Sequence, residues 1–300
     1  MSVRIGVNPI AWSNDDKQSL GGHIPLETCL SEARQAGYAG IELGHKFPRD
    51  AATLRPIMEA HQIRLVGGWY STELLTRSVA DEIAAAEGHL KLLKDMGCHI
   101  FILAETSNAI HGIEAANLST SPVLTSVEMK IFCTNMSEFC SYIQDQGLTV
   151  AYHHHMGTVV ETPGEITSFM DGTGDSVGLL LDTGHMRFGG GDPATVASTY
   201  ASRITHLHCK DVRRPVLDSA RRHDTTFLDA VVEGVFTVPG DGSVDFPPVL
   251  DALKAVNFDG WIVVEAEQDP NKANPLEYTT MGYRNLSKMI VDAGFDIEID

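Results

Sequence analysis

The 300-residue sequence predicts an α/β protein built as a single (β/α)8 TIM barrel domain over residues 1–300. Hydrophobic residues make up 43% of the chain and charged residues 21%, as in ordinary globular proteins. Short β-branched segments alternate with amphipathic, helix-like segments eight times along the chain. Neither a Pro/Ser/Gly-rich linker nor a long block of like charge interrupts this alternation, so we expect one domain.

The predicted strands are short segments rich in Val, Ile and Leu, as expected for barrel strands that are buried on both faces. They are Val3–Asn8, Ala39–Leu43, Arg64–Gly68, His99–Ala104, Leu148–His153, Val177–Asp182, Ile204–Cys209 and Trp261–Glu265. Eight such βα units in series favour a closed barrel. A doubly wound open sheet is the alternative, but the sequence lacks the GxGxxG and GxxxxGK(S/T) loops of nucleotide-binding members of that class.

The predicted helices have recognisable start and stop signals, such as proline in the first turn and glycine after the last. Helices are expected from Pro25 to Gly37, after Asp50, from Ser78 to Met96, from Pro122 to Gln146, after Pro163, after Asp192-Pro193, from Pro247 to Val256 and from Asn274 to Ala293. Each helix follows one of the predicted strands, which completes the βα alternation.

The segment 212–242 does not follow this alternation. It lies between the seventh strand and the next helix, is longer than an ordinary βα loop, and contains Arg213, Arg214, Arg221 and Arg222. Insertions at this point of a barrel rise over the C-terminal face, where active sites lie. We expect this one to be either a lid or pocket wall, or a solvated surface element.

The charge of the chain narrows the choice of partners. Its 40 acidic and 22 basic residues give a net charge of −18, which repels nucleic-acid phosphates and anionic lipids. We therefore expect no nucleic acid and no membrane as partner, and instead a small neutral ligand or a bound cation. The five cysteines lack CxxC spacing, and the N-terminus lacks a signal-peptide pattern. We expect a cytoplasmic protein with reduced thiols.

Polar residues stand where the predicted strands end, at the C-terminal mouth of the barrel. The fifth to eighth strands end with His153, Asp182, His208 and Glu265. Four nitrogen and oxygen ligands at one mouth suit a divalent metal, whose charge the two carboxylates would neutralise. A buried His–carboxylate hydrogen-bond network without metal is the alternative.

Motifs in the C-terminal half resemble the xylose-isomerase-like sugar phosphate isomerase/epimerase superfamily. They are LLLDTGH (179–185), HLHCKDV (206–212), VPGDGSVDFPPVLDAL (238–253) and GWIVVE (260–265). GVNPIAWSND (6–15), GGWYS (67–71), AYHHHMGT (151–158) and VVEAEQDP (263–270) resemble, more narrowly, the inosose dehydratases of bacterial inositol catabolism. The resemblance covers essentially the whole chain.

This resemblance implies a metal site of Asp182, His208 and Glu265 with a fourth ligand from the fifth strand. It also matches His185 to a substrate-contacting histidine, and Arg214 lies near a basic residue after the seventh strand. Relatives usually carry a glutamate where this chain has His153. The fourth ligand can therefore be the His153 nitrogen, a water molecule or the substrate. We hypothesise that histidine in place of glutamate at this position favours elimination over epimerisation, which needs two bases.

The implied activity is a metal-dependent dehydratase that converts 2-keto-myo-inositol, a small cyclic polyol ketone, to a trihydroxycyclohexane-1,2-dione. Manganese or cobalt is expected, because two imidazoles shift preference away from magnesium. Elimination needs a base for the α-proton and an acid for the β-hydroxyl. Glu265 is the candidate base, and the candidate acids are His155, His185 and Lys210. Lys210 can instead pair with Asp211 or a neighbouring carboxylate.

The substrate's hydroxyl groups and ring face have further candidate partners, which are Asn8, Trp12, Glu42, Trp69, Glu105 and Arg214. The two tryptophans can equally be packing residues of the barrel rim. A sugar or inosose isomerase or epimerase is the alternative function. A metal-dependent endonuclease or a non-catalytic sugar-binding protein are more distant ones. The resemblance also suggests a homo-oligomer.

Overall fold

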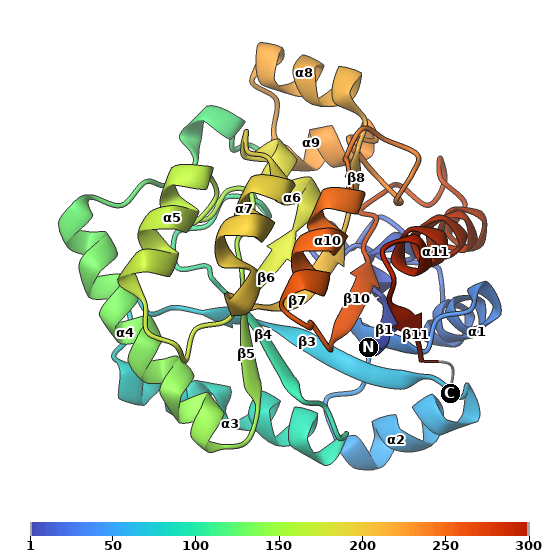
Figure 1. Ribbon diagram of the computed structural model, residues 1–300, viewed down its shortest axis with the longest axis horizontal. Coiled ribbons are helices and arrows are strands. Elements are labelled where there is room, and N and C mark those ends of the chain that lie inside the picture. The colour runs from blue at the N-terminus through green and yellow to red at the C-terminus, as the bar shows by residue number, and fades with distance from the viewer. Residues whose placement is uncertain (1, 299–300) are drawn as a thin grey trace.

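Eight parallel strands close into a barrel in the computed structural model, which describes residues 2–298 (Figure 1). The barrel strands are β1 (Ser2–Val7), β2 (Gly40–Leu43), β3 (Arg64–Thr72), β4 (Ile100–Glu105), β5 (Thr149–His153), β6 (Leu179–Asp182), β7 (Ile204–Cys209) and β10 (Trp261–Val264). β1 pairs with β10 from Arg4 opposite Trp261 to Val7 opposite Val264, which closes the ring. The predicted barrel is confirmed, and the open sheet is wrong.

The strands have nearly the predicted bounds, with one clear difference. β3 continues to Thr72 instead of ending at Gly68, because Trp69 to Thr72 pair in parallel with Ile102 to Glu105 of β4. The short strand β11 (Asp296–Ile297) adds to β1 outside the ring. The longer β3 brings Trp69 into a strand of the barrel wall.

The helices pack around the outside of the ring (Figure 1). The eight predicted helices are α1 (Leu26–Ala36), α2 (Ala51–Ala60), α3 (Val79–Asp95), α4 (Ser126–Asp145), α5 (Pro163–Gly172), α7 (Pro193–Tyr200), α10 (Pro247–Ala255) and α11 (Pro275–Asp292). α4 begins at Ser126 and not at Pro122, because Thr125 and Glu128 form a reciprocal capping box. α1 ends at Gly37, whose φ of +111° is a left-handed conformation that glycine adopts without strain.

Helix α6 (Thr183–Phe188) starts directly after the sixth strand and was not predicted. Its N-cap is Asp182, whose carboxylate accepts a hydrogen bond of 2.7 Å from the His185 backbone N–H. One side chain therefore ends β6, starts α6 and holds the backbone of a second polar residue. Three single-turn 3-10 helices, η1 (Pro9–Ala11), η2 (Leu118–Thr120) and η3 (Ala201–Arg203), complete the connections described.

The segment 212–242 is folded rather than a plain loop. It contains α8 (Arg214–His223) and α9 (Phe227–Val232), and the antiparallel pair β8 (Asp211–Val212) and β9 (Phe236–Thr237) brackets these helices. Figure 1 shows α8 and α9 beyond the ends of β6 and β7. The segment has its own apolar cluster, in which Phe227 and Phe236 are buried. The centroid of the Phe236 ring lies 5.2 Å from that of His185, so the segment packs directly on a histidine of α6.

The interior of the barrel changes from apolar to polar along the strands. Ile100, Ile102, Ala151 and Leu180 form a small apolar cluster of their own. Side chains of a strand alternate between its faces, so the inward residues two places beyond Ala151 and Leu180 are His153 and Asp182. The same alternation places polar groups at the C-terminal mouth.

Within residues 2–298, every helix is too short or too polar to cross a bilayer.

Candidate active site

A cavity of about 90 Å³ opens where the strands end at the C-terminal mouth. Its lining residues are Asn8, Ile10, Asp15, Asp16, Glu42, Leu43, Trp69, Ile102, His111, His153, His155, His208 and Glu265. A larger cavity of about 480 Å³ lies at the opposite end of the barrel, between residues such as Arg4, Thr149 and Trp261 at the starts of strands. None of the predicted site residues lines the larger cavity, whereas several of them line the smaller one.

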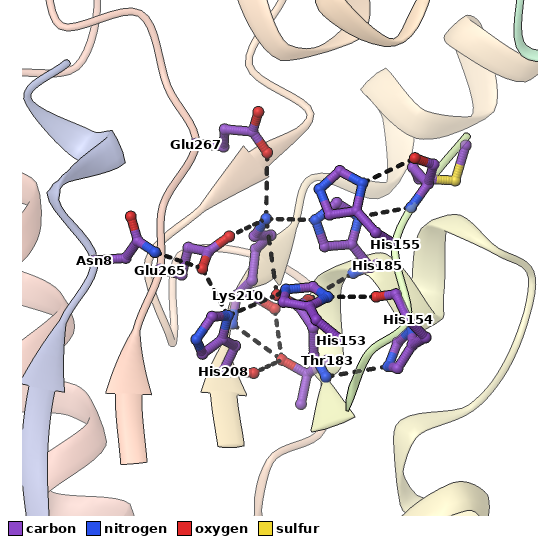
Figure 2. A network of polar contacts seen from close by, with 12 residues as sticks. Asn8, His153, His154, His155, Thr183, His185, His208, Lys210, Glu265 and Glu267 are labelled. Atoms are coloured by element: carbon purple, nitrogen blue, oxygen red, sulfur yellow. Dashed lines mark hydrogen bonds and ion pairs between the residues drawn. The ribbon is translucent and has the colours of Figure 1, made fainter. Parts of the chain in front are cut away.

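The four predicted metal ligands lie together at this mouth. Figure 2 shows three of them, His153, His208 and Glu265. His153, Asp182, His208 and Glu265 are buried, and each offers one ligand atom within 4.8 Å of the others. Asp182 Oδ2 lies 3.6 Å from His208 Nδ1 and is buried without a hydrogen-bond partner among the described residues. A buried carboxylate oxygen without such a partner, facing the other three side chains, fits a bound cation.

The orientation of His153 also suits a metal ligand. Its Nδ1 lies 2.6 Å from the His154 carbonyl oxygen, to which it donates. The proton is then on Nδ1, and the lone pair of Nε2 faces Asp182 Oδ2 at 3.8 Å. A backbone acceptor on the outer nitrogen is the usual support of a metal-bound imidazole. Burial lowers the pKa of His153 to about 3, which keeps the imidazole neutral.

His208 lies between carboxylates on both sides of its ring. Nδ1 is 2.6 Å from Glu265 Oε2, and Nε2 is 3.0 Å from Glu42 Oε1. Burial lowers the pKa of His208, but the two glutamates outweigh it and raise the pKa well above its ordinary value. The position between Nδ1 and Glu265 therefore favours positive charge, which a proton or a metal ion can supply. With two nitrogen and two carboxylate ligands, the site fits a divalent metal.

Glu42 is part of the support of this site. Its carboxylate accepts hydrogen bonds from His206 Nε2 at 2.8 Å, from His208 Nε2 at 3.0 Å and from Asn8 Nδ2 at 2.8 Å. Burial by itself raises the pKa of Glu42, but the two histidines bring it down to about 2. Asn8 also donates to Glu265 at 3.1 Å and so connects Glu42 to Glu265.

Lys210 provides a buried positive charge next to His208 and Glu265 (Figure 2). Its Nζ lies 2.6 Å from Glu265 Oε1, 3.2 Å from Glu267 Oε2 and 2.7 Å from His185 Nε2. Asp211 is not its partner, because the Asp211 carboxylate accepts backbone N–H groups, including that of Gly242. Burial raises the pKa of Glu267 to about 7, while Lys210 opposes this shift.

The structure brings most of the predicted residues to the cavity or next to it. Asn8, Glu42, Trp69 and His155 line it, and the His185 ring packs against that of His155 with 3.8 Å between centroids. The predicted roles of these residues stay predictions, because no substrate is bound.

Three predicted substrate-binding residues lie outside the cavity. Trp12 is buried in the core, and its Nε1 donates to Glu32 at 2.6 Å. Glu105 is buried and accepts local hydrogen bonds, such as that of 2.8 Å from the Leu74 N–H. The Arg214 side chain is 65% exposed on α8 and pairs with Asp218 at 2.8 Å. Each is engaged by a partner that also lies outside the cavity lining.

Three polar residues of the cavity were not predicted from the sequence, namely Asp15, Asp16 and His111. The two aspartates closely follow the first strand, in the connection that a barrel directs to its C-terminal face, and that position was an available signal. His111 lies in the long connection after β4, and nothing in its sequence neighbourhood marks it.

A family model described as xylose isomerase-like TIM barrel matches residues 30–285. The rhizopine catabolism protein MocC of Rhizobium meliloti is 48% identical over 98% of this chain and 91% of its own length. The inosose dehydratase of Geobacillus thermodenitrificans is 40% identical over 92% of this chain and 93% of its own length. That of Lacticaseibacillus casei is 39% identical, with 95% and 97% covered.

Solved structures agree with the fold. An L-ribulose 3-epimerase superposes with a TM-score of 0.66 at 15% identity, covering 97% of this chain and 95% of that one. The probable 3-DHS dehydratase AsbF from Bacillus anthracis gives 0.68 at 13% identity, with 96% and 99% covered. At these identities the likeness concerns the barrel architecture alone.

Proposed function

This chain belongs to the xylose isomerase-like TIM barrel family, and we propose that it is an inosose dehydratase. This enzyme is a hydro-lyase that removes water from 2-keto-myo-inositol and forms a trihydroxycyclohexane-1,2-dione. Inosose dehydratases of several bacteria match it along more than nine-tenths of its length. The observation that carries the proposal is the buried group of His153, Asp182, His208 and Glu265 beside a cavity with further polar walls.

We propose that these four residues hold a divalent metal, with His153 as the fourth ligand through Nε2. The support is the free lone pair of His153 Nε2 and the buried Asp182 Oδ2, which has no hydrogen-bond partner among the described residues. Two imidazole nitrogens favour manganese or cobalt over magnesium, which prefers all-oxygen sites. Zinc is less suited, because its preferred tetrahedral geometry leaves too few positions for a substrate that binds through two oxygens.

When bound, the metal supplies positive charge that polarises the ketone and stabilises the negative charge developing as the α-proton leaves. Glu265 is proposed to accept that proton, since it lines the cavity and is ionised. Although burial raises its pKa, Lys210 and His208 hold the pKa well below its ordinary value. Asn8 and Lys210 bond its two carboxylate oxygens and so fix its orientation.

The aromatic residues of the segment 212–242 keep water away from one side of the site. Phe227 and Phe236 are buried and pack on the His185 ring, with centroids 5.9 and 5.2 Å away. Lys210 Nζ lies 4.6 Å from the centroid of Phe236. We propose that this segment is a pocket wall, since a dry surrounding strengthens the charge interactions among Lys210 and the carboxylates.

Product analysis tests the proposal. The protein is stripped with a chelator, reloaded with manganese or cobalt, and given 2-keto-myo-inositol, and the mixture is followed by mass spectrometry. We expect metal-dependent loss of one water. An unchanged mass with new inosose isomers would instead establish an isomerase or epimerase. No reaction by protein that demonstrably holds metal would show that the substrate is wrong.

A further inference from the structure

The dehydration proposed above needs an acid, because the departing hydroxyl is a poor leaving group until it receives a proton. The three acids expected from the sequence are poorly placed for this. Lys210 and His185 contact each other and do not line the cavity. His155 lines it, but its Nδ1 lies 2.8 Å from the Met156 carbonyl oxygen and donates to it. Neutral His155 therefore presents an acceptor, not a donor, at Nε2.

Asp16 is the carboxyl group of the cavity wall with the fewest ties to the protein. It lines the cavity, and its Oδ1 lies 3.6 Å from His111 Nε2, a distance longer than a hydrogen bond. Its neighbour Asp15 is held differently, because His45 Nδ1 lies 2.6 Å from Asp15 Oδ1. Glu42 and Glu265 are both engaged by histidines. Asp16 thus keeps its carboxyl available to a ligand.

The backbone of Asp16 is held firmly although its carboxyl is not. Asn14 is fully buried, and its Oδ1 accepts the backbone N–H groups of Asp16 at 2.8 Å and Lys17 at 2.6 Å. Asn14 Nδ2 in turn donates to Glu267 Oε1 at 3.3 Å. This Asx turn ties the connection after β1 to the end of β10, so the position of Asp16 relative to Glu265 is set by the fold.

The surroundings of Asp16 allow it to carry a proton near neutral pH. Its side chain is 23% exposed, and the charged groups that act on it are Asp15, Lys210, Glu265 and Glu267, with His111 beside it. Burial, followed by the neighbouring acids, raises the pKa of Asp16 to about 6, although Lys210 opposes the shift. A carboxylic acid in this range is a competent proton donor.

We propose that Asp16 is the general acid of the reaction and protonates the leaving hydroxyl, an inference that rests on the dehydratase function. The O–H bond of the Asp16 carboxyl breaks as its proton bonds to the β-hydroxyl oxygen. The C–O bond then breaks with its electron pair on oxygen, which departs as water. The electron pair of the former C–H bond, whose proton went to the base, forms the new C=C bond. Solvent reprotonates the Asp16 carboxylate.

Asp16→Asn provides the test, because the amide has the same shape but no proton to transfer. The first measurement is loss of water from 2-keto-myo-inositol by metal-loaded protein. The second uses an analogue in which fluorine replaces the β-hydroxyl, since fluoride leaves without a proton. The third is exchange of the α-hydrogen with deuterated water. We expect water loss to fall about 100-fold or more, with fluoride release and exchange within about threefold of wild type.

Glu114→Gln is the matched control. Glu114 is 72% exposed and pairs with Lys17, the residue that follows Asp16 in the chain. The substitution therefore removes a nearby charge without altering the cavity wall. We expect it to leave all three measurements unchanged. Asp16→Glu keeps an acid at the site and should recover part of the water loss that Asp16→Asn removes.

The outcomes separate the two proposals. Undiminished water loss by Asp16→Asn, with wild type active, overturns the role of Asp16 and leaves the dehydratase function intact. If Asp16→Asn lowers the rates of water loss and of fluoride release by the same factor, and Asp16→Glu does not recover them, the acid role of Asp16 is also overturned. That result would show a binding or structural role for Asp16. Failure of the wild-type protein to release water overturns the dehydratase function, and the acid role with it.

Discussion

His208 Nε2 lies 3.0 Å from Glu42 Oε1, at the inner end of the candidate metal site. This contact places the proton on Nε2 and leaves Nδ1 as the atom that faces Asp182 and Glu265. Glu42 comes from the second strand and His208 from the seventh, so the contact crosses the barrel interior. A carboxylate behind a metal-binding histidine fixes its tautomer and ring orientation.

Glu42→Gln should therefore weaken metal binding without removing a ligand. We expect the dissociation constant for manganese or cobalt to rise about 10- to 100-fold, the usual effect of losing such an outer partner. Titration calorimetry or competition with a chelator measures it. Asp218→Asn, which removes an exposed carboxylate that pairs with Arg214, is the control and should bind as wild type does. Equal affinities for wild type and Glu42→Gln would contradict the assignment.

His153 is expected to affect both metal content and the course of the reaction. His153→Ala removes a nitrogen ligand and should lower the metal bound per chain after dialysis, measured by elemental analysis. His153→Glu introduces the carboxylate that the resemblance to the isomerase/epimerase superfamily implies at this position, and it should retain metal while lowering the rate of water loss and allowing exchange or epimerisation. The idea fails if His153→Glu leaves the dehydration rate and the metal content both untouched.

Lys210 should matter for folding as well as for chemistry. Its buried ammonium lies near Glu265, Glu267 and Asp182, the last at 3.7 Å, so Lys210→Met leaves several buried acids without compensation. We expect metal-free protein to lose about 3–5 kcal/mol of unfolding free energy, measured by urea denaturation. Adding Glu267→Gln to this variant removes one of the uncompensated acids and should restore part of the loss. A double variant no more stable than Lys210→Met would argue against this cause.

His89 gives a pH dependence that lies outside the metal site. It packs beneath Tyr70 and Phe101, and its Nε2 donates to the Gly68 carbonyl oxygen at 3.1 Å. Burial lowers the pKa of His89 from 6.5 to about 4. Between these values the unfolded chain binds the extra proton and the folded chain does not, so stability decreases as pH falls from about 6.5 to about 4.

The variant His89→Gln, which retains a hydrogen-bond donor but does not titrate, should lack this part of the acid destabilisation. The full shift corresponds to at most about 3 kcal/mol. Urea denaturation of both proteins at pH 7 and at pH 4.5 measures the difference. Parallel losses in the two proteins would show that His89 does not contribute.

The strands and the inward residues at their ends could be predicted because both depend on local rules. Apolar β-branched runs mark the strands, and the alternation of side chains assigns faces. A parallel barrel brings all C-terminal strand ends to one mouth, so His153, Asp182, His208 and Glu265 could be expected together from their positions alone.

Other features depended on contacts that the strand pattern does not show. Trp12 donates to Glu32, Glu105 accepts from the Leu74 N–H, and Arg214 pairs with Asp218 one helical turn away, and all three lie outside the cavity. By contrast, the connections after β1 and β4 bring Asp16 and His111 into the wall of the cavity. The barrel and the meeting of His153, Asp182, His208 and Glu265 follow from the order of residues along the strands, because strand periodicity is a local property. The remaining cavity walls come from connecting loops, whose positions depend on long-range contacts such as that of Asn14 with Glu267, and no local pattern encodes these.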